Sequence, residues 1–246
     1  MPNITDTVTT PDGACPVRLF TPDGQGPWPG VVMYPDAGGV RDTFDEMAAK
    51  LAGYGYAVLL PDVYYRHGDW APIDMKTAFG DPKERKRLMS MIGSVTPMMM
   101  AMDAGAFFDY LAGRPEVRGD RFGTTGYCMG GRTSLVVAGR QPDRVAAAAS
   151  FHGGGLVSDS ADSPHLGADE IRAAVYVAGA ENDGSFTAEH AEQLDKALTA
   201  AGVQHTIETY PAAHGFAVPD NPPYDAAAAD RHWAATREFF RANLAR

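Results

Sequence analysis

The chain has 246 residues, 45% of them hydrophobic and 21% charged, so its length suits one large domain or two small ones with a sizeable core. The formal net charge of −10 argues against a nucleic acid or an anionic membrane as partner, because an acidic surface is repelled by both. The first residues show no basic, apolar leader, and the two cysteines, Cys15 and Cys128, are expected as reduced thiols in the cytoplasm.

The N-terminal part of the chain predicts an edge hairpin followed by two buried strands. Residues 6–20 form two alternating runs around the turn at 11–13, which is typical of a hairpin at a sheet edge. The apolar runs 30–34 and 56–60 predict strands buried on both faces, and 43–52 predicts a helix between them.

Residues 62–95 follow no clear period and hold several aromatic side chains. Such a long insertion, placed after a strand, indicates a lid or a wall over a binding site. The charged run at 81–87 within it predicts the solvated face of a helix.

The rest of the chain alternates helices and strands. In chain order we expect a helix at 97–112, a strand at 121–125, a helix from 132, strands at 144–151 and 173–179, a helix at 187–201, a strand at 205–210 and a helix at 225–244. This alternation predicts one α/β domain over residues 1–246, with a mostly parallel central sheet and helices on both faces.

The stretch Gly126-Tyr127-Cys128-Met129-Gly130-Gly131 joins a predicted strand directly to a predicted helix. Gly-x-Cys-x-Gly in this position is the pattern of a nucleophile elbow, in which the nucleophile takes a strained backbone conformation that flanking glycines make room for. The N-terminus of the following helix favours a thiolate and can hold an oxyanion. A small buried core cysteine is the alternative interpretation.

Three reactive side chains follow predicted strands in the order nucleophile, acid, histidine. Cys128, Asp183 and His214 would meet at the carboxyl edge of a parallel sheet and form a triad that activates a thiol. Glu181 and Asn182 are alternatives for the acid. His152, which also follows a strand, is interpreted as part of a tight glycine loop near the pocket, with residues 153–155.

With these motifs, and with 61–66, Gly179…Asp183 and 213–216, the chain resembles the dienelactone hydrolase family of α/β-hydrolases over nearly its whole length. The resemblance implies the α/β-hydrolase fold and hydrolysis of a lactone or carboxylic ester through a thioester acyl-enzyme, without cofactor or metal. It also implies Cys128 as nucleophile, His214 as base and Asp183 as orienting acid. The oxyanion hole would use the backbone N–H groups of Ala37 and Met129.

The chain also departs from the family pattern near the site. Asp36 stands where the family has a thiol-activating Glu, so Asp36 is expected to tune the thiol. Arg66, expected to contact substrate together with Tyr64, matches one of the two arginines that bind dienelactone's carboxylate, but the second position is Val218. Half of a charge-assisted clamp is missing, which predicts a preference for neutral esters or lactones.

A rival hypothesis from another class is a non-catalytic protein that binds a small molecule or senses oxidants through Cys128, since an exposed, activated thiol serves that role equally well. A metal or nucleotide enzyme is disfavoured, because no His-x-x-x-His pair, Cys-x-x-Cys or phosphate-binding glycine loop is present. The expected partner is a small ester or lactone, and the expected state is a monomer or a small homo-oligomer.

Overall fold

The structure is a computed structural model that describes residues 4–244; residues 1–3, where a leader would begin, lie outside the described part. The described chain forms one eight-stranded sheet in the order β1-β2-β4-β3-β5-β6-β7-β8. Its strands are β1 (Ile4–Thr10), β2 (Gly13–Phe20), β3 (Trp28–Tyr34), β4 (Ala57–Pro61), β5 (Val117–Tyr127), β6 (Val145–Phe151), β7 (Ala174–Asn182) and β8 (His205–Ala213). β1, β2 and β4 pair antiparallel and every other neighbouring pair is parallel, so the predictions of an edge hairpin and a mostly parallel sheet are confirmed.

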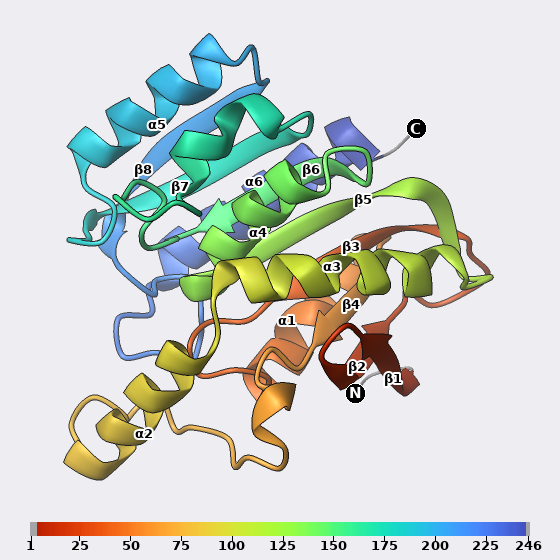
Figure 1. Ribbon diagram of the computed structural model, residues 1–246, viewed down its shortest axis with the longest axis horizontal. Coiled ribbons are helices and arrows are strands. Elements are labelled where there is room, and N and C mark those ends of the chain that lie inside the picture. The colour runs from red at the N-terminus through yellow and green to blue at the C-terminus, as the bar shows by residue number, and fades with distance from the viewer. Residues whose placement is uncertain (1–3, 245–246) are drawn as a thin grey trace.

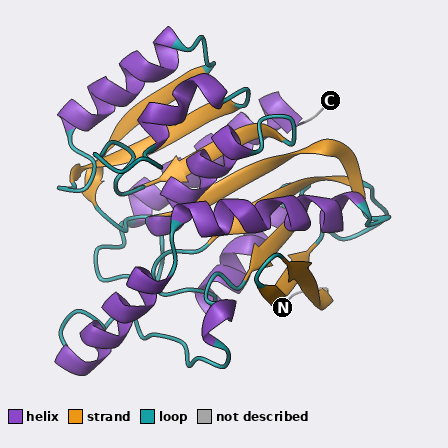
Figure 2. Ribbon diagram, viewed as in Figure 1, coloured by secondary structure: helices purple, strands orange, loops and turns teal. Residues whose placement is uncertain are grey.

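Helices cover both faces of the sheet, as Figure 1 and Figure 2 show. They are α1 (Asp42–Ala52), α2 (Pro82–Ser94), α3 (Pro97–Ala112), α4 (Met129–Arg140), α5 (Ala188–Ala200) and α6 (Ala226–Leu244). One apolar cluster joins α3, α4 and α5 to one face, and a second joins α1 and α6 to the other. The strand ends at the carboxyl edge are therefore fixed from both sides, which gives side chains placed there a rigid base.

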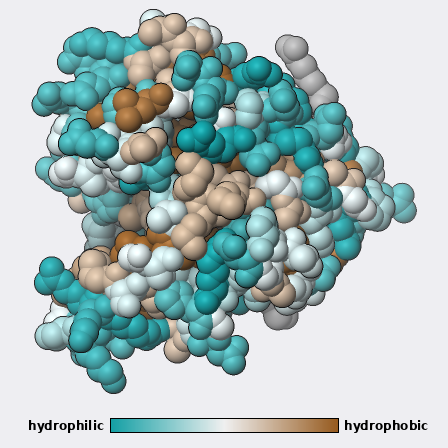
Figure 3. Space-filling model, in the orientation of Figure 1, coloured by the Kyte–Doolittle hydropathy of each residue, from teal (hydrophilic) through white to brown (hydrophobic). Residues whose placement is uncertain are grey.

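Residues 62–95 hold little regular structure apart from the short 3₁₀ helix η1 (Tyr65–His67) and α2. The side chain of Asp81 accepts the backbone N–H groups of Lys83 and Glu84 and so caps α2. Most of the charged run is exposed, and the lobe that α2 forms at the lower left is largely hydrophilic in Figure 3, which confirms the predicted solvated helix face.

β5 and one 3₁₀ helix differ most from the sequence prediction; α4 also begins at 129 instead of 132, and β7 and β8 each end three residues later than expected. β5 begins at Val117 rather than near residue 121, because the polar stretch that precedes the apolar run pairs with Trp28 and Pro29 of β3. The 3₁₀ helix η2 (Pro164–Glu170) lacks a helical apolar period, and so it was not expected. Within residues 4–244, no single helix is long and apolar enough to cross a membrane; only α2 and α3 together, across a 64° bend, reach that length and composition.

Candidate active site

The carboxyl edge of the sheet brings together the three side chains expected to form a triad. Cys128 directly follows β5, Asp183 directly follows β7, and His214 directly follows β8. These strands run parallel with only β6 between β5 and β7, so their ends lie at one edge.

Cys128 lies at a sharp strand-to-helix turn with φ 54° and ψ −116°, a conformation that residues with a side chain rarely adopt. Glycines on both sides make the turn possible. A Cβ at Gly126 would overlap the carbonyl of Gly130, and a Cβ at Gly130 would overlap the carbonyl of Tyr34 at the end of β3. The predicted strain at Cys128 and the predicted need for flanking glycines are both confirmed.

The imidazole of His214 interacts with both other side chains. His214 Nδ1 lies 2.7 Å from Asp183 Oδ2, and Cys128 is near enough to raise the pKa of the imidazole. Asp183 is buried, whereas Glu181 and Asn182, the alternatives for the acid, are exposed. The geometry therefore assigns the contact with the histidine to Asp183.

The groups around the imidazole favour the protonated form of His214. Burial disfavours the charged imidazolium, but the interactions with Asp183 and Cys128 outweigh this effect and raise the pKa of His214 to about 10. Burial also works against an ionised Asp183, yet hydrogen bonds from His214 and Ser185 hold the pKa of that carboxyl below its usual value. An imidazolium between a carboxylate and a thiol is the arrangement that stabilises a thiolate.

Two backbone N–H groups point to an oxyanion hole. Among the residues that the structure describes, Ala37 N–H has no hydrogen-bond acceptor, and Met129 is the first residue of α4, where no carbonyl within the helix is in reach. The hydroxyl of Tyr64 donates to the Ala37 carbonyl oxygen at 2.8 Å and so fixes the orientation of that loop. Unpaired donors at a helix N-terminus and in a fixed loop are suited to an oxyanion.

Asp36, which is expected to tune the thiol, makes its hydrogen bonds to other groups. Both oxygens of the buried carboxylate are bonded to Arg41, at 2.7 and 3.0 Å, and Gly38 N–H and the Asn221 amide complete the set. Arg41 also binds Asp220 in the loop after His214, at 2.6 and 2.8 Å. Asp36, through Arg41 and Asn221, therefore joins the loop after β3 to the loop after β8.

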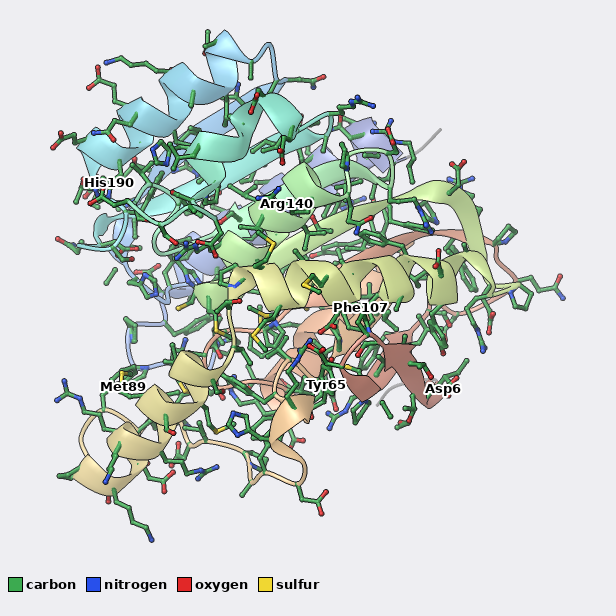
Figure 4. All side chains as sticks on the ribbon, viewed as in Figure 1. Asp6, Tyr65, Met89, Phe107, Arg140 and His190 are labelled. Atoms are coloured by element: carbon green, nitrogen blue, oxygen red, sulfur yellow. The ribbon has the colours of Figure 1, made fainter. Side chains whose placement is uncertain are left out.

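Arg66, which is expected to contact substrate, makes ion pairs with two carboxylates. Its guanidinium binds Asp12 at 2.7 Å and Asp103 at 2.9 Å, and it stacks 4.5 Å over the ring of Tyr65. Tyr65, labelled in Figure 4, lies below α3 on the side of the β1–β2 hairpin. Val218, at the position of the second clamp residue, is fully buried. A short motif cannot reveal these pairs, because both carboxylates are distant from Arg66 in the sequence.

Residues 62–95 lie against the loop that carries Ala37. A Cβ on Gly39 would overlap the indole of Trp70, and a Cβ on Gly38 would lie 2.8 Å from the sulfur of Met75. Trp70 is held by a 2.9 Å hydrogen bond from its indole N–H to Asp62. The insertion thus places apolar side chains beside the candidate oxyanion hole.

Two further residues touch the site. Ser185 is not identified from the sequence, and His152 is interpreted there as part of a glycine loop. Ser185 binds Asp183, and the spacing Asp-x-Ser, typical of a turn in which the carboxylate accepts the second N–H, is the signal that could have found it. His152 is buried with φ 39°, and its ring lies 5.3 Å from that of His214. Burial, together with the neighbouring His214, lowers the pKa of His152 well below its usual value, so this ring is neutral.

Within residues 4–244, no group of three His, Cys, Asp or Glu side chains has the geometry to hold a metal ion.

The model of the "Dienelactone hydrolase family" matches residues 15–244. A "Putative carboxymethylenebutenolidase" from Synechocystis is 28% identical over 230 residues, which cover 92% of this chain and 91% of that protein.

Solved structures share the fold over nearly the whole chain. A "Putative Dienelactone Hydrolase" from Klebsiella pneumoniae superposes with a TM-score of 0.80 at 24% identity, covering 96% of this chain and 98% of the other. A dienelactone hydrolase-like promiscuous phosphotriesterase from metagenomic libraries has a TM-score of 0.75 at 27% identity, covering 98% of each chain.

Proposed function

Because the chain belongs to the dienelactone hydrolase family, we propose that it hydrolyses a lactone or carboxylic ester through a thioester on Cys128. The observation that carries the proposal is the Asp183–His214 hydrogen bond at the same sheet edge as a thiol at a strained elbow, with Cys128 near enough to raise the pKa of His214. Strain of this kind costs about 1–3 kcal/mol and persists at functional sites.

In the acylation step, the Cys128 thiolate attacks the carbonyl carbon of the substrate. The carbonyl oxygen becomes an oxyanion that accepts hydrogen bonds from Ala37 and Met129 N–H. His214 gives its proton to the alkoxide as the C–O bond breaks, which leaves a thioester on Cys128 and an alcohol, or the freed hydroxyl end of an opened lactone.

Deacylation reverses these roles. The neutral His214 takes a proton from water, and the resulting hydroxide attacks the thioester carbon. The tetrahedral intermediate collapses, the C–S bond breaks, and Cys128 leaves as a thiolate beside the imidazolium while the carboxylic acid departs. Asp183 keeps the imidazole in the tautomer that carries its proton on Nδ1 throughout.

The rival hypothesis of an oxidant sensor receives less support. Cys15, the second thiol of the chain, is fully buried and contacts the carbonyl oxygens of Pro16 and Asp62. Both cysteines are free. A sensor usually has a resolving thiol beside an accessible one, and a buried Cys15 is poorly suited to that task.

The surroundings of the site favour a neutral substrate. Arg41 and Arg66 are each bound to two carboxylates, so neither guanidinium is free to hold a substrate carboxylate. Trp70 and Met75 supply apolar surface beside the oxyanion loop. We therefore propose that residues 62–95 form a wall of the substrate pocket and that neutral, largely apolar esters or lactones are preferred over anionic dienelactones.

Mass spectrometry of the intact protein, mixed with activated esters and lactones, tests the chemistry. The expected result is an acyl adduct that maps to Cys128, disappears with time and is blocked by iodoacetamide. Cys128→Ala should abolish turnover and retain the fold, while Cys15→Ala serves as the matched control and should retain turnover. Turnover in Cys128→Ala, or no adduct and no product with any substrate while Cys128 is still alkylated, would contradict the proposal.

A further inference from the structure

The carboxylate of Asp183 is held by a residue outside the triad. Its Oδ2 faces His214 Nδ1 at 2.7 Å, and its Oδ1 accepts two hydrogen bonds from Ser185. The Ser185 hydroxyl lies 2.6 Å from Oδ1 and the Ser185 backbone N–H lies 2.8 Å from it. Each carboxylate oxygen therefore has its own donor or donors, and the orientation of the group is determined.

The position of Ser185 is itself fixed by a neighbouring loop. The Gly155 N–H donates to the Ser185 carbonyl oxygen at 3.2 Å, and a Cβ on Gly154 would lie 3.0 Å from the Ser185 hydroxyl oxygen. The glycine loop after His152 thus makes room for Ser185 and holds it against Asp183. This gives a structural use to a glycine-rich stretch that lies after the nucleophile in the sequence.

The hydroxyl also lies 3.4 Å from His214 Nδ1. The bond to Asp183 is shorter and has a charged acceptor, which makes it the stronger of the two. The hydroxyl proton therefore goes to the carboxylate, and the Nδ1 proton goes to Oδ2. The hydrogen bond from Ser185 contributes to lowering the pKa of Asp183 against the opposing effect of burial.

We propose that Ser185 is a positioning residue of the triad, an inference that rests on the proposed function. It keeps Asp183 ionised and aims Oδ2 at His214, so that the imidazolium formed at each stage is stabilised in one orientation. Its short hydrogen bonds are to Asp183, and it acts through that carboxylate rather than on substrate.

A purely structural role for Ser185 is the alternative, since an Asp that accepts the N–H two residues on is a common turn. The two roles can be separated because the turn uses the backbone N–H, which any residue supplies. Ser185→Ala removes the hydroxyl and keeps the turn. Ser185 is exposed, so its truncation leaves no buried cavity.

The test compares Ser185→Ala, Ser185→Thr and Thr187→Ala in the full-length protein. Thr187 caps α5 two residues away by accepting the His190 N–H at 3.3 Å, and it makes no bond to Asp183. Measurements are kcat and KM on an activated neutral ester, the acid limb of the kcat/KM profile, and the melting temperature. A turnover-free readout is the pH at which the proton resonance of the His214 Nδ1–H is lost on acidification.

For Ser185→Ala we expect kcat to be roughly tenfold lower and KM to stay within about twofold of the wild-type value. The loss of a hydrogen bond to a charged group typically lowers an equilibrium or rate constant by about tenfold or more. The acid limb and the loss of the Nδ1–H resonance should both move to higher pH, since the pKa of Asp183 rises toward its usual value. Ser185→Thr should restore both. Thr187→Ala should lower the melting temperature and leave kcat and the acid limb unchanged.

The outcomes separate the two proposals. If the wild-type protein shows no turnover, the proposed function fails, and the Nδ1–H resonance still decides the role of Ser185. The inference about Ser185 is overturned if Ser185→Ala matches the wild-type protein in kcat and in the pH at which the resonance is lost. It is also overturned if Thr187→Ala changes these quantities as much as Ser185→Ala does.

Discussion

Replacing Asp36 by Asn distinguishes thiol activation from loop fixation. The carboxylate is 1% exposed and makes two hydrogen bonds to Arg41, whose own exposure is 7%. Removing one partner of a buried ion pair typically costs about 3–5 kcal/mol. Arg41 keeps both bonds to Asp220, so we expect the lower end, about 3 kcal/mol.

For a chain of this length, each kcal/mol lowers the melting temperature by about 2–4 °C. Asp36→Asn should therefore lower it by about 6–12 °C. Asp220→Asn is the matched control, because it removes the other carboxylate from the same guanidinium. That side chain is 25% exposed, so its loss should cost about 1–2 kcal/mol, or about 2–8 °C.

The rate of Cys128 alkylation by iodoacetamide gives the second measurement. The charged group that interacts with Cys128 is His214, whereas the Asp36 carboxylate binds Arg41, so Asp36→Asn should leave this rate within about twofold of the wild-type rate. The value of kcat should fall by roughly tenfold, because the loop that carries Ala37 N–H loses its link to Arg41. An unchanged melting temperature with a tenfold slower alkylation would refute this reasoning and return Asp36 to the role of thiol activator.

Three further outcomes follow from the structure. The profile of kcat/KM against pH should fall as the pH rises through about 10, because His214 then loses the proton that it gives to the leaving group. Gly126→Ala should abolish activity or folding, since its Cβ would overlap the Gly130 carbonyl, whereas Gly105→Ala in α3, where the nearest atom is 3.6 Å away, should be tolerated in a melting experiment. In steady-state assays, kcat/KM for a neutral ester should exceed that for an anionic dienelactone of similar size by at least about tenfold, and the reverse order would mean that an arginine leaves its carboxylates for substrate.

The placement of the three candidate triad residues at one sheet edge was predictable from the sequence, because local structure places each of them. Cys128, Asp183 and His214 each follow an apolar run, and parallel strands bring such positions to one edge of the sheet. The elbow was predictable for the same reason. The glycines two residues before and two residues after Cys128 indicate that other backbone segments approach too closely for any side chain to fit.

The ion pairs around the site were not predictable, because their partners are distant in the chain. Arg41 and Asp220 are 179 residues apart, and Arg66 and Asp103 are 37 apart. A match to a family position does not reveal whether the arginine is already paired with carboxylates elsewhere in the chain. Asp36 shows the same effect: the residue type suited thiol activation, and the nearby Arg41 takes both of its oxygens.

Two kinds of contact fix the proposed oxyanion hole. The elbow presses Gly130 against the Tyr34 carbonyl at the end of β3, the strand that leads into the loop of Ala37, so the spacing of the two N–H donors depends on packed backbone. The orientation of that loop depends on side chains, namely the Tyr64 hydroxyl on one side and the Asp36–Arg41 pair on the other. A change in the backbone contact should destroy the site, whereas a change in the side chains should alter the rate and leave the nucleophile reactive. The side chains of this loop and of residues 62–95 are therefore where differences in substrate preference can arise without loss of the chemistry.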